Sequence, residues 1–415
     1  MGKIPAIADF ADGYNPLSMS ELAYGTIEDI YSVARRLLKE RGPVIEGEPF
    51  DLFGMAGRGG GHGSAPAFLV LGNDEIREML SDAKTFNQDC HAEMFGKTVG
   101  NTLTVLNDPI HGKVRRVFQM AFMPHNIARW GDELVGPVAN ELVDRFVGRG
   151  RAELVNDFSL PFPFEIIYRQ LDLPGQDTAV FHKMAVALLG SYGDMRKYAL
   201  EASEKLGVYF KRLIEQRRAN PGGDLISALV AAEVDGEYIP EDIMISFLRQ
   251  LLSAGGDTTY RGTGSMMIGL LQKPDQLEQV RADRSLVPQA VEEALRWEAA
   301  TPIAMRSAAC DTELGGVKIP KGAVLTVVTS AANRDPERYP NPDAFDIHRP
   351  KTRHLTFSYG PHVCIGQHLA RLEMARALNV LLDRLPNLRL DPDMPPPRVT
   401  GFYFRTPKDV HVRFD

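Results

Sequence analysis

Cys364 lies in a loop rich in glycine and proline, and its surroundings suit an anionic sulfur. The loop runs from Phe357 to Gly366 and reads Phe-Ser-Tyr-Gly-Pro-His-Val-Cys-Ile-Gly. A stretch with leucines at helical spacing follows, so the cysteine is expected at a helix N-terminus, where backbone N–H groups and the helix dipole stabilise a thiolate. Gly360 and Gly366 let the backbone approach a bulky group without a Cβ clash. The residues predict a thiolate held in a dry, shaped niche.

Three kinds of chemistry compete for this cysteine. A hydrolytic nucleophile needs a base, and His362 or His368 is poorly placed for that role beside so tight a loop. A zinc ligand needs a second cysteine two to four residues away, and the sequence has none at that spacing. The third is the axial thiolate of a haem, without the Cys-x-x-Cys-His motif of covalent attachment. A buried thiol used only for packing is the alternative without chemistry.

A second group that could do chemistry lies inside a long helical segment, residues 240–272. Gly255 and Gly256 interrupt its apolar run and are followed at once by Asp257 and Thr258. Two glycines inside a helix cost about 1 kcal/mol each relative to alanine, and a threonine that bonds back to the helix can bend it. The stretch predicts either a groove with a proton-handling pair beside it, or a packing glycine with a polar patch facing water.

Two further pairs have helical spacing. His111 and Arg115 follow an Asp-Pro step, which is a good helix start, and they share one helix face. Together they suit a carboxylate or phosphate partner, or else they belong to a solvated basic face. Glu293 and Arg296 are three residues apart in another predicted helix and can form an ion pair, although such pairs are usually surface bridges.

The elements that position these residues are mostly helical. Hydrophobic periodicity predicts helices at 26–41, 72–82, 132–147, 176–190, 194–219, 223–233, 240–272 and 286–298. Strands are predicted at 43–53, 67–71, 304–309, 314–319 and 323–328, with 399–404 and 410–414 as a pair in the tail. The glycine-rich stretch 57–64 is interpreted as a hairpin tip, because it fits no phosphate-binding spacing. Residues 83–106 are predicted to form an irregular loop over a binding site.

Composition excludes several classes of protein. The 415 residues carry a formal net charge of −7 and a pI of about 5.9, which does not suggest a nucleic-acid-binding protein. Only three cysteines occur and none are close in sequence, so we expect a reducing, cytoplasmic environment. No stretch approaches ~18 uninterrupted apolar residues, so neither a signal peptide nor a membrane span is expected.

Together, these motifs resemble those of the cytochrome P-450 family, and the resemblance covers nearly the whole chain. The cysteine loop resembles the family's Phe-x-x-Gly-x-x-x-Cys-x-Gly, and Ala254–Thr258 resembles the oxygen-activating helix motif. Glu293-Ala-Leu-Arg296 resembles Glu-x-x-Arg, with Arg349 as the third member of a structural triad. The pair His111 and Arg115 resembles the propionate-binding helix. One small departure is Ser358, where many bacterial members have glycine.

The resemblance implies a cytochrome P-450 fold that is mainly α with a smaller antiparallel β part. It implies one domain over residues 1–415, β-rich at about 43–71, 304–328 and 399–414, and no fused reductase. Haem b would lie between the long oxygen-activating helix and the helix after the cysteine loop, with Cys364 ligating the iron. The residues implied to bind the haem are His111, Arg115, Ala254, Gly255, Arg306, Phe357, His362, Cys364 and Gly366. Glu293, Arg296 and Arg349 would support the fold.

The implied activity is that of a haem-thiolate monooxygenase, which activates O2 and hydroxylates or epoxidises a small-to-medium apolar molecule. Asp257 and Thr258 would be catalytic, steering protons to the bound oxygen. A haem-thiolate sensor without turnover and a peroxide-driven member of the family are the alternatives, and the acid–alcohol pair argues against both. Side chains expected to contact the substrate are Gln250, Ser253, Ile303, Ala304, Met305 and Phe402.

The resemblance also implies a separate electron donor. Two electrons would come from a [2Fe–2S] ferredoxin and its reductase, so that NAD(P)H acts only through these partners. A basic docking patch is expected from Lys113, Arg116, Lys351, Arg353, Arg371 and Arg376, with solubility charge as the alternative. We expect a cytoplasmic monomer that binds neither nucleic acid nor a membrane.

Overall fold

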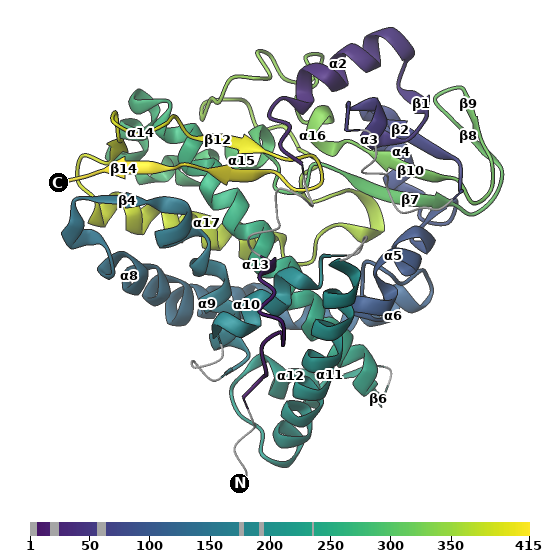
Figure 1. Cartoon of the computed structure of the whole chain (residues 1–415), viewed down its shortest axis with the longest axis horizontal. Coiled ribbons are helices and arrows are strands. Elements are labelled where there is room, and N and C mark those ends of the chain that lie inside the picture. The colour runs from purple at the N-terminus through teal and green to yellow at the C-terminus, as the bar shows by residue number, and fades with distance from the viewer. Residues whose placement is uncertain (1–5, 17–24, 56–63, 174–177, 191–194, 235) are drawn as a thin grey trace.

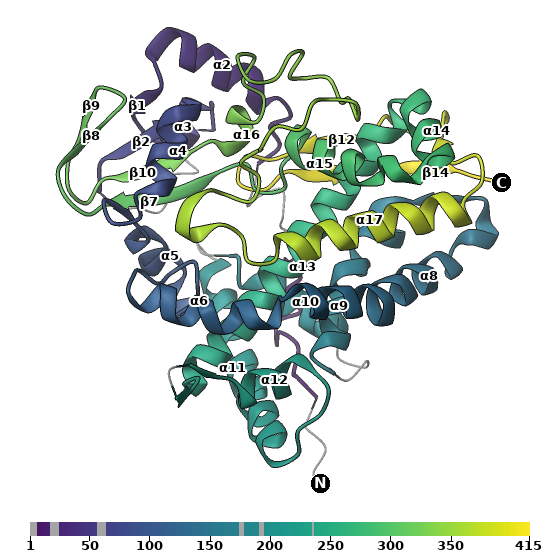
Figure 2. The ribbon, with the colours of Figure 1, turned by 180° about the vertical axis from the view of Figure 1, so that it is seen from behind.

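The computed structural model describes residues 6–16, 25–55, 64–173, 178–190, 195–234 and 236–415. The molecule has a roughly triangular outline, with its largest β sheet at one corner and helices filling most of the remainder (Figures 1 and 2). Helices dominate the described residues and strands are short, as predicted. Most of the predicted glycine-rich hairpin tip, residues 57–64, lies outside the described residues.

The elements have the following bounds. The α-helices are α2 (Ile30–Arg41), α3 (Pro49–Leu52), α4 (Asn73–Ser81), α5 (Asp89–Val99), α6 (Ile110–Ala121), α7 (Pro124–Trp130), α8 (Gly136–Asp144), α9 (Pro161–Gln170), α10 (Thr178–Ala187), α11 (Met195–Ala219), α12 (Leu225–Ala231), α13 (Glu241–Leu271), α14 (Pro274–Ala282), α15 (Val287–Trp297), α16 (Thr329–Ala332) and α17 (Gln367–Arg384). Shorter helical turns are η2 (Gly131–Val135), η3 (Val147–Arg149), η4 (Val155–Ser159), η6 (Arg284–Leu286) and η7 (Gly360–His362). The strands are β1 (Val44–Glu46), β2 (Ala67–Val70), β3 (Phe86–Asn87), β4 (Arg151–Glu153), β5 (Glu233–Val234), β6 (Glu237–Tyr238), β7 (Ala304–Ala308), β8 (Thr312–Leu314), β9 (Val317–Ile319), β10 (Val324–Val327), β11 (Arg389–Leu390), β12 (Arg398–Thr400), β13 (Thr406–Lys408) and β14 (His411–Arg413).

The largest sheet has the strand order β1-β2-β10-β7-β3. Its pairings are antiparallel, as predicted, except that β2 and β10 run parallel. The predicted tail pair is wrong. Strand β12 pairs with β13, whereas β14 joins β11 and β4 in a separate three-stranded sheet. Asp409, in a left-handed conformation with φ of 58°, turns the chain between β13 and β14 and so separates the two sheets.

Helix α13 forms the centre of the helical part and is buried along most of its length. It begins after Pro240 with Glu241 and Asp242 in its first turn, which are favourable at the positive end of a helix dipole. Its neighbours include α9, α11, α15 and α17. Seen from behind, α17 crosses the molecule beside α8 (Figure 2).

Several predicted boundaries need correction. Helix α2 begins at Ile30 because the Asp29 side chain accepts hydrogen bonds from two backbone N–H groups and caps the helix there. The predicted strand 43–53 ends early, because Pro49 starts the short helix α3. Residues 83–106 are not irregular throughout. They contain β3 and α5, and α5 buries Cys90 and Met94 at helical spacing. Helix α9, which has a proline in its first turn, was not among the predicted segments.

Candidate active site

Cys364 lies between η7 and α17, with Gly366 as the N-cap residue of that helix. Its backbone N–H donates to the carbonyl oxygen of Phe357 at 2.9 Å, which closes the loop. Nη2 of Arg115, from α6, donates to the carbonyl oxygen of Val363 at 2.7 Å and ties the loop to a second helix. Gly360 has a φ of +71°, and a Cβ there would collide with the backbone of Leu80. Gly360 is therefore required by the close approach of the Leu80 backbone, whereas a Cβ at Gly366 would meet no atom closer than Cys364 Sγ at 4.0 Å. The predicted approach of these glycines to a bulky group stays a prediction.

The Cys364 thiol is accessible, although protein surrounds it closely enough that burial raises its pKa. Hydrogen bonds from the backbone N–H groups of Gly366 and Gln367 act in the opposite direction and lower the pKa, as do the nearby guanidinium groups of Arg115 and Arg371. These groups would stabilise a thiolate once a cation such as a metal ion approached the sulfur.

A cluster of cation-capable side chains lies beside the cysteine loop. The rings of His111 and His362 are 3.9 Å apart between centroids. Burial, with the nearby His111 and Arg306, lowers the pKa of His362 to about 3. One member of the cluster lies close to an acid, because His111 Nδ1 is 3.5 Å from Asp108 Oδ1. The cluster consists of His91, His111, Arg115, Arg306 and His362.

The cluster fits an anionic ligand. Cation-capable groups outnumber acids here, and His111 Nε2 is buried with no hydrogen-bond partner among the described residues. His91 was missed by the sequence reasoning. Burial and the charge of Arg306 lower its pKa to about 3, so it belongs to the same group. Its position in α5 was hidden because residues 83–106 were interpreted as irregular. The cluster and the thiol together suit haem, which needs one iron ligand and partners for two carboxylates.

Within residues 251–271 of α13, which are otherwise buried, Ala254, Gly255 and Thr258 keep accessible surface. Thr258 Oγ1 donates to the carbonyl oxygen of Ala254 at 2.7 Å, which is the predicted back-bonding contact. The helix is nevertheless unbroken through both glycines. Gly256 is a packing glycine, because a Cβ there would collide with the ring of Phe164 in α9. The packing interpretation therefore holds for Gly256, and the proton-handling pair stays a prediction.

Asp257 does not face water. Only 2% of its side chain is exposed, and its two oxygens accept hydrogen bonds from Nε and Nη2 of Arg261 at 2.9 and 3.0 Å. The polar-patch interpretation is wrong for this residue. Arg261 was missed, although its spacing of four residues from Asp257 is the ordinary sequence signal for a helical ion pair.

The structural triad is assembled as the resemblance implied. Arg296 donates to both carboxylate oxygens of Glu293, each at 2.7 Å, and Arg349 lies 3.3 Å from the same carboxylate. All three side chains are buried. Arg296 also donates to the carbonyl oxygens of Asn333, Pro342 and Ala344, so the triad fixes the irregular segment before the cysteine loop.

The side chains expected to contact a substrate are spread over different environments. Gln250 Nε2 donates to Thr104 Oγ1 at 2.9 Å, and Ser253 is buried and bonds back to its own helix. Ala304 is half-buried. The remaining three are buried in hydrophobic clusters. Ile303 and Phe402 share a cluster with Phe50 and Phe53, whereas Met305 packs with Cys90, Met94 and Val324.

Two members of the expected docking patch are paired. Arg371 bonds the carboxylate of Glu292 at 2.5 Å, and His354 lies 3.2 Å from the same group. Arg376 bonds Asp132 at 2.6 Å. The other four cations of the expected patch are exposed: Lys113, Arg116, Lys351 and Arg353.

Metal clusters and membrane-spanning helices can be assessed only for the residues that the structure describes. These residues contain no group of three or more His, Cys, Asp or Glu side chains suited to hold a metal ion. In the same residues, no helix is both long and apolar enough to cross a membrane.

Comparisons with known proteins extend these observations. A family model described as "Cytochrome P450" matches residues 176–411. The chain is 34% identical over 323 residues to the putative cytochrome P450 YjiB of Bacillus subtilis, covering 76% of this chain and 81% of the relative. It is 42% identical over 287 residues to a vitamin D3 dihydroxylase of Streptomyces griseolus, covering 69% of this chain and 70% of the relative.

Solved structures give the same result for the fold. P450BioI, crystallised with a fatty-acid-ligated acyl carrier protein, superimposes with a TM-score of 0.82 at 29% identity, covering 93% of this chain and 98% of that one. CYP108D1 of Novosphingobium aromaticivorans superimposes with a TM-score of 0.81 at 30% identity over the whole of both chains. The fold class predicted from the motifs is confirmed.

Proposed function

The chain belongs to the cytochrome P450 family and is a haem-thiolate monooxygenase, and we propose that Cys364 is the residue that ligates its haem iron. When bound, the haem supplies the activation of dioxygen, one atom of which enters the substrate. The observation that supports the assignment is that an accessible thiol at the N-terminus of α17 lies beside the cluster of cation-capable side chains. Replacing Cys364 by serine should leave the fold and abolish the thiolate-type haem spectrum.

The cluster of cation-capable side chains is the proposed site for the two haem carboxylates. His111 and His362 lie ring against ring, and a carboxylate beside them would accept hydrogen bonds from protonated nitrogens. Burial and neighbouring positive groups lower the pKa values of His91 and His362, and the negative charge of a bound anion would act in the opposite direction. Phe357 and Gly366 would pack against the ring on the cysteine side, with Ala254 and Gly255 on the opposite side.

Thr258 and Asp257 are the proposed proton-handling pair. Thr258 has accessible surface next to Ala254, so its hydroxyl can hold a proton on the reaction side of α13. Asp257, one residue earlier, can resupply that proton from the other side. We expect Thr258→Ala to keep its haem but to divert electrons from product into peroxide. Fully retained coupling in that variant would exclude Thr258 from proton delivery.

Members of this family receive electrons from a redox partner, and the proposed partner here is a [2Fe–2S] ferredoxin with its reductase. The exposed cations Lys113 and Arg116 lie on α6, the helix that also ties down the cysteine loop. An acidic partner bound there would approach the haem from the cysteine side. Rising ionic strength should slow reduction, and Lys113→Glu should slow it further, whereas Lys39→Glu on α2 should have no effect. If neither rising salt nor Lys113→Glu slows reduction, this docking site is excluded.

The proposed substrate is a small-to-medium apolar molecule, which would be hydroxylated or epoxidised. One relative is named as a vitamin D3 dihydroxylase, and Gln250 and Ala304 offer partly accessible side chains for substrate contact. Ser253, Ile303, Met305 and Phe402 would form the layer behind them. A screen for compounds that shift the haem spin state would identify the substrate class. A screen in which only charged compounds produce the shift would contradict it.

One experiment separates this function from its alternatives. NADH-dependent product formation with ferredoxin and reductase supports the monooxygenase. Spin-state shifts without any product indicate a sensor, and product formed with peroxide alone indicates a peroxide-driven enzyme. The three cysteines are free thiols, which supports the cytoplasm as the proposed compartment.

A further inference from the structure

We propose that residues 6–15 form a strap that holds α10 and α11 together, and that release of this strap limits how fast a bulky ligand reaches or leaves the haem site. The inference rests on the proposed haem site, and it adds a conformational control that lies outside that site. Its support comes from the contacts of the strap, from its backbone, and from the position of the two helices that it joins.

One residue of the strap bridges both helices. The Asp9 carboxylate accepts a hydrogen bond from Nζ of Lys183 in α10 at 2.5 Å. The carbonyl oxygen of Asp9 accepts a second one from Nζ of Lys205 in α11 at 2.7 Å. Because moving either helix away from the other breaks one of these two bonds, the docked strap opposes their separation.

Aromatic side chains extend the contact along α11. Tyr14 stacks on Tyr198 of α11, with the ring centroids 3.5 Å apart and the planes 2° apart, and the Tyr198 hydroxyl donates to the Asp12 carboxylate at 2.6 Å. Phe10 meets the Tyr198 ring edge-on at 5.7 Å. Phe10 is only 4% exposed, and Ile7 is buried as well. These apolar contacts supply most of the docking free energy, because exposed ion pairs contribute little.

The backbone of the strap allows it to detach while the rest of the chain stays folded. Residues 6–15 belong to no helix or strand. The N–H hydrogen bonds within the strap are local: Gly13 donates to the carbonyl oxygen of Phe10, and Phe10 and Tyr14 donate to the side chains of Asp9 and Asp12. A segment held by a few side chains, without a β ladder, opens at a lower free energy than the core.

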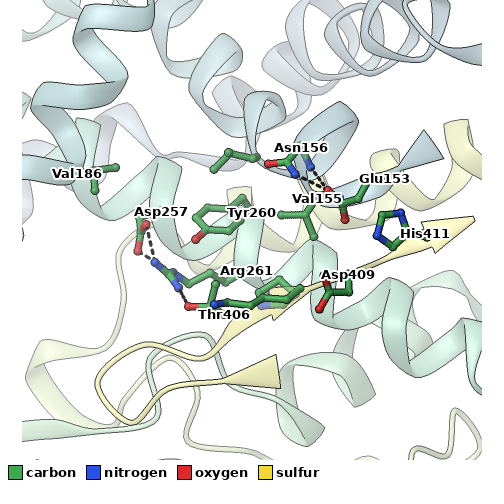
Figure 3. A pocket seen from close by; sticks show the side chains of 13 residues that line it. Glu153, Val155, Asn156, Val186, Asp257, Tyr260, Arg261, Thr406, Asp409 and His411 are labelled. Carbon is green, nitrogen blue, oxygen red and sulfur yellow. Dashed lines mark hydrogen bonds and ion pairs between the residues drawn. The ribbon is translucent and has the colours of Figure 1, made fainter. Parts of the chain in front are cut away.

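The two strapped helices lie over the part of α13 that carries the glycine pair. Val186 of α10 and Asp257 of α13 line the same pocket (Figure 3). Arg249 of α13 donates to the carbonyl oxygen of Ser203 in α11 at 2.6 Å, and α11 also packs against α5, which carries His91. Figure 1 shows the dark purple strap running along the corner that α10, α11 and α12 form. Separation of α10 and α11 would therefore widen the way to the haem site.

This arrangement has a kinetic signature. If a bulky ligand passes only when the strap is released, its rate of entry is proportional to the fraction of molecules in that state. Weaker docking raises this fraction, so the rates of entry and exit increase by the same factor. The equilibrium affinity stays unchanged, because the strap does not contact the ligand.

The test uses the full, haem-loaded chain. Phe10→Ala weakens the apolar docking of the strap. Phe414→Ala is its matched control, because Phe414 is also 4% exposed but lies in a different part of the chain. Exchange of charges between Asp9→Lys and Lys183→Asp tests the bridge to α10. Asp383→Lys, at an exposed ion pair of α17, is the control for a reversed charge.

Two readouts are needed. Hydrogen–deuterium exchange followed by mass spectrometry reports the opening of α10 and α11 without any turnover. Stopped-flow absorbance reports the binding and release of 4-phenylimidazole, a bulky probe whose nitrogen coordinates haem iron. Carbon monoxide is the small probe, and its binding rate reveals any general change at the haem.

We expect Phe10→Ala to speed exchange in α10 and α11 and to raise the binding and release rates of 4-phenylimidazole by about tenfold or more, with an unchanged Kd. Carbon monoxide binding should not change, and Phe414→Ala should alter none of these quantities. Asp9→Lys and Lys183→Asp should each raise the 4-phenylimidazole rates about two- to fivefold, and the double variant should restore them. Asp383→Lys should have no effect. If Phe10→Ala does not fold, the charge exchange still tests the strap.

Unchanged hydrogen exchange in α10 and α11 of Phe10→Ala would overturn the strap. Faster exchange with unchanged 4-phenylimidazole rates would overturn its control of ligand entry, as would an equal increase for carbon monoxide. A double variant that is no slower than the single ones would overturn the bridge between Asp9 and Lys183. Failure of the proposed function would look different, because the unsubstituted protein would then lack the thiolate-type spectrum with carbon monoxide, whereas hydrogen exchange would still report on the strap.

Discussion

Ser358 is a position in the cysteine loop where a substitution should make the protein more stable. Its φ is +65°, in the left-handed region, where a side chain costs about 1–2 kcal/mol because Cβ crowds the following carbonyl group. Its hydroxyl is buried, and no hydrogen-bond partner for it exists among the described residues. Such an unpaired polar group costs about 1–3 kcal/mol.

Glycine at this position would remove both costs. It would also increase the entropy of the unfolded chain, which offsets about 0.5–1 kcal/mol of the gain. We therefore expect Ser358→Gly to raise the free energy of unfolding by about 2 kcal/mol. Ser358→Ala removes the hydroxyl but keeps Cβ, so it should gain only about 1 kcal/mol. The difference between the two variants measures the backbone strain less the entropic offset of glycine.

The assay is equilibrium unfolding in urea, followed by far-ultraviolet circular dichroism on the haem-loaded protein. Haem content and the carbon monoxide spectrum of each variant serve as controls for an intact site. If glycine is no more stable than alanine at this position, the argument from left-handed strain is refuted. If neither variant exceeds the serine protein, the hydroxyl has a partner and the second contribution is refuted as well.

Three further predictions concern the framework around the site. Arg296→Leu should cost about 3–5 kcal/mol of unfolding free energy, because it removes both 2.7 Å contacts of the buried Glu293 carboxylate and leaves only the longer one with Arg349. Arg284→Leu, at a more exposed pair, should cost under about 1 kcal/mol. Equal effects in urea titrations would contradict this. Gly256→Ala should cost about 1–3 kcal/mol through overlap with the aromatic ring of α9, whereas Gly223→Ala, with open space around its Cβ position, should be nearly neutral in the same titrations. Burial alone would raise the pKa of Glu292, but hydrogen bonds from its imidazole and guanidinium partners lower it from 4.5 to about 2. Its contribution to stability is therefore complete above about pH 4.5 and lost towards pH 2, and the stability lost in Glu292→Gln at pH 7 should shrink over that interval; a difference independent of pH would refute the pairing.

Local patterns predicted the parts of the site that lie on one helix or one loop. Helix α13 has a long apolar period, an acidic first turn and its glycine pair, all of which can be read without tertiary contacts. The Cys364 loop is similarly local, because its left-handed residues and its hydrogen bond from Cys364 to Phe357 are close in sequence.

Features that depend on long-range packing could not be predicted in the same way. The parallel pairing of β2 with β10 joins segments that lie far apart in the sequence, and nothing in either strand specifies it. The position of His91 depends on how α5 packs against the sheet and the cysteine loop. The spacing of Arg261 from Asp257 was visible, but its buried position depends on the β12–β13 hairpin, which reaches it from the end of the chain.

The central claim is that Cys364 ligates the haem iron as a thiolate. The most direct test is the absorption spectrum of the reduced protein under carbon monoxide, compared with that of a Cys364→His variant. Thiolate ligation by Cys364 predicts a strongly red-shifted Soret band for the unsubstituted protein and an imidazole-type band for the variant. An imidazole-type spectrum in the unsubstituted protein, or a red-shifted band that survives the substitution, would contradict it.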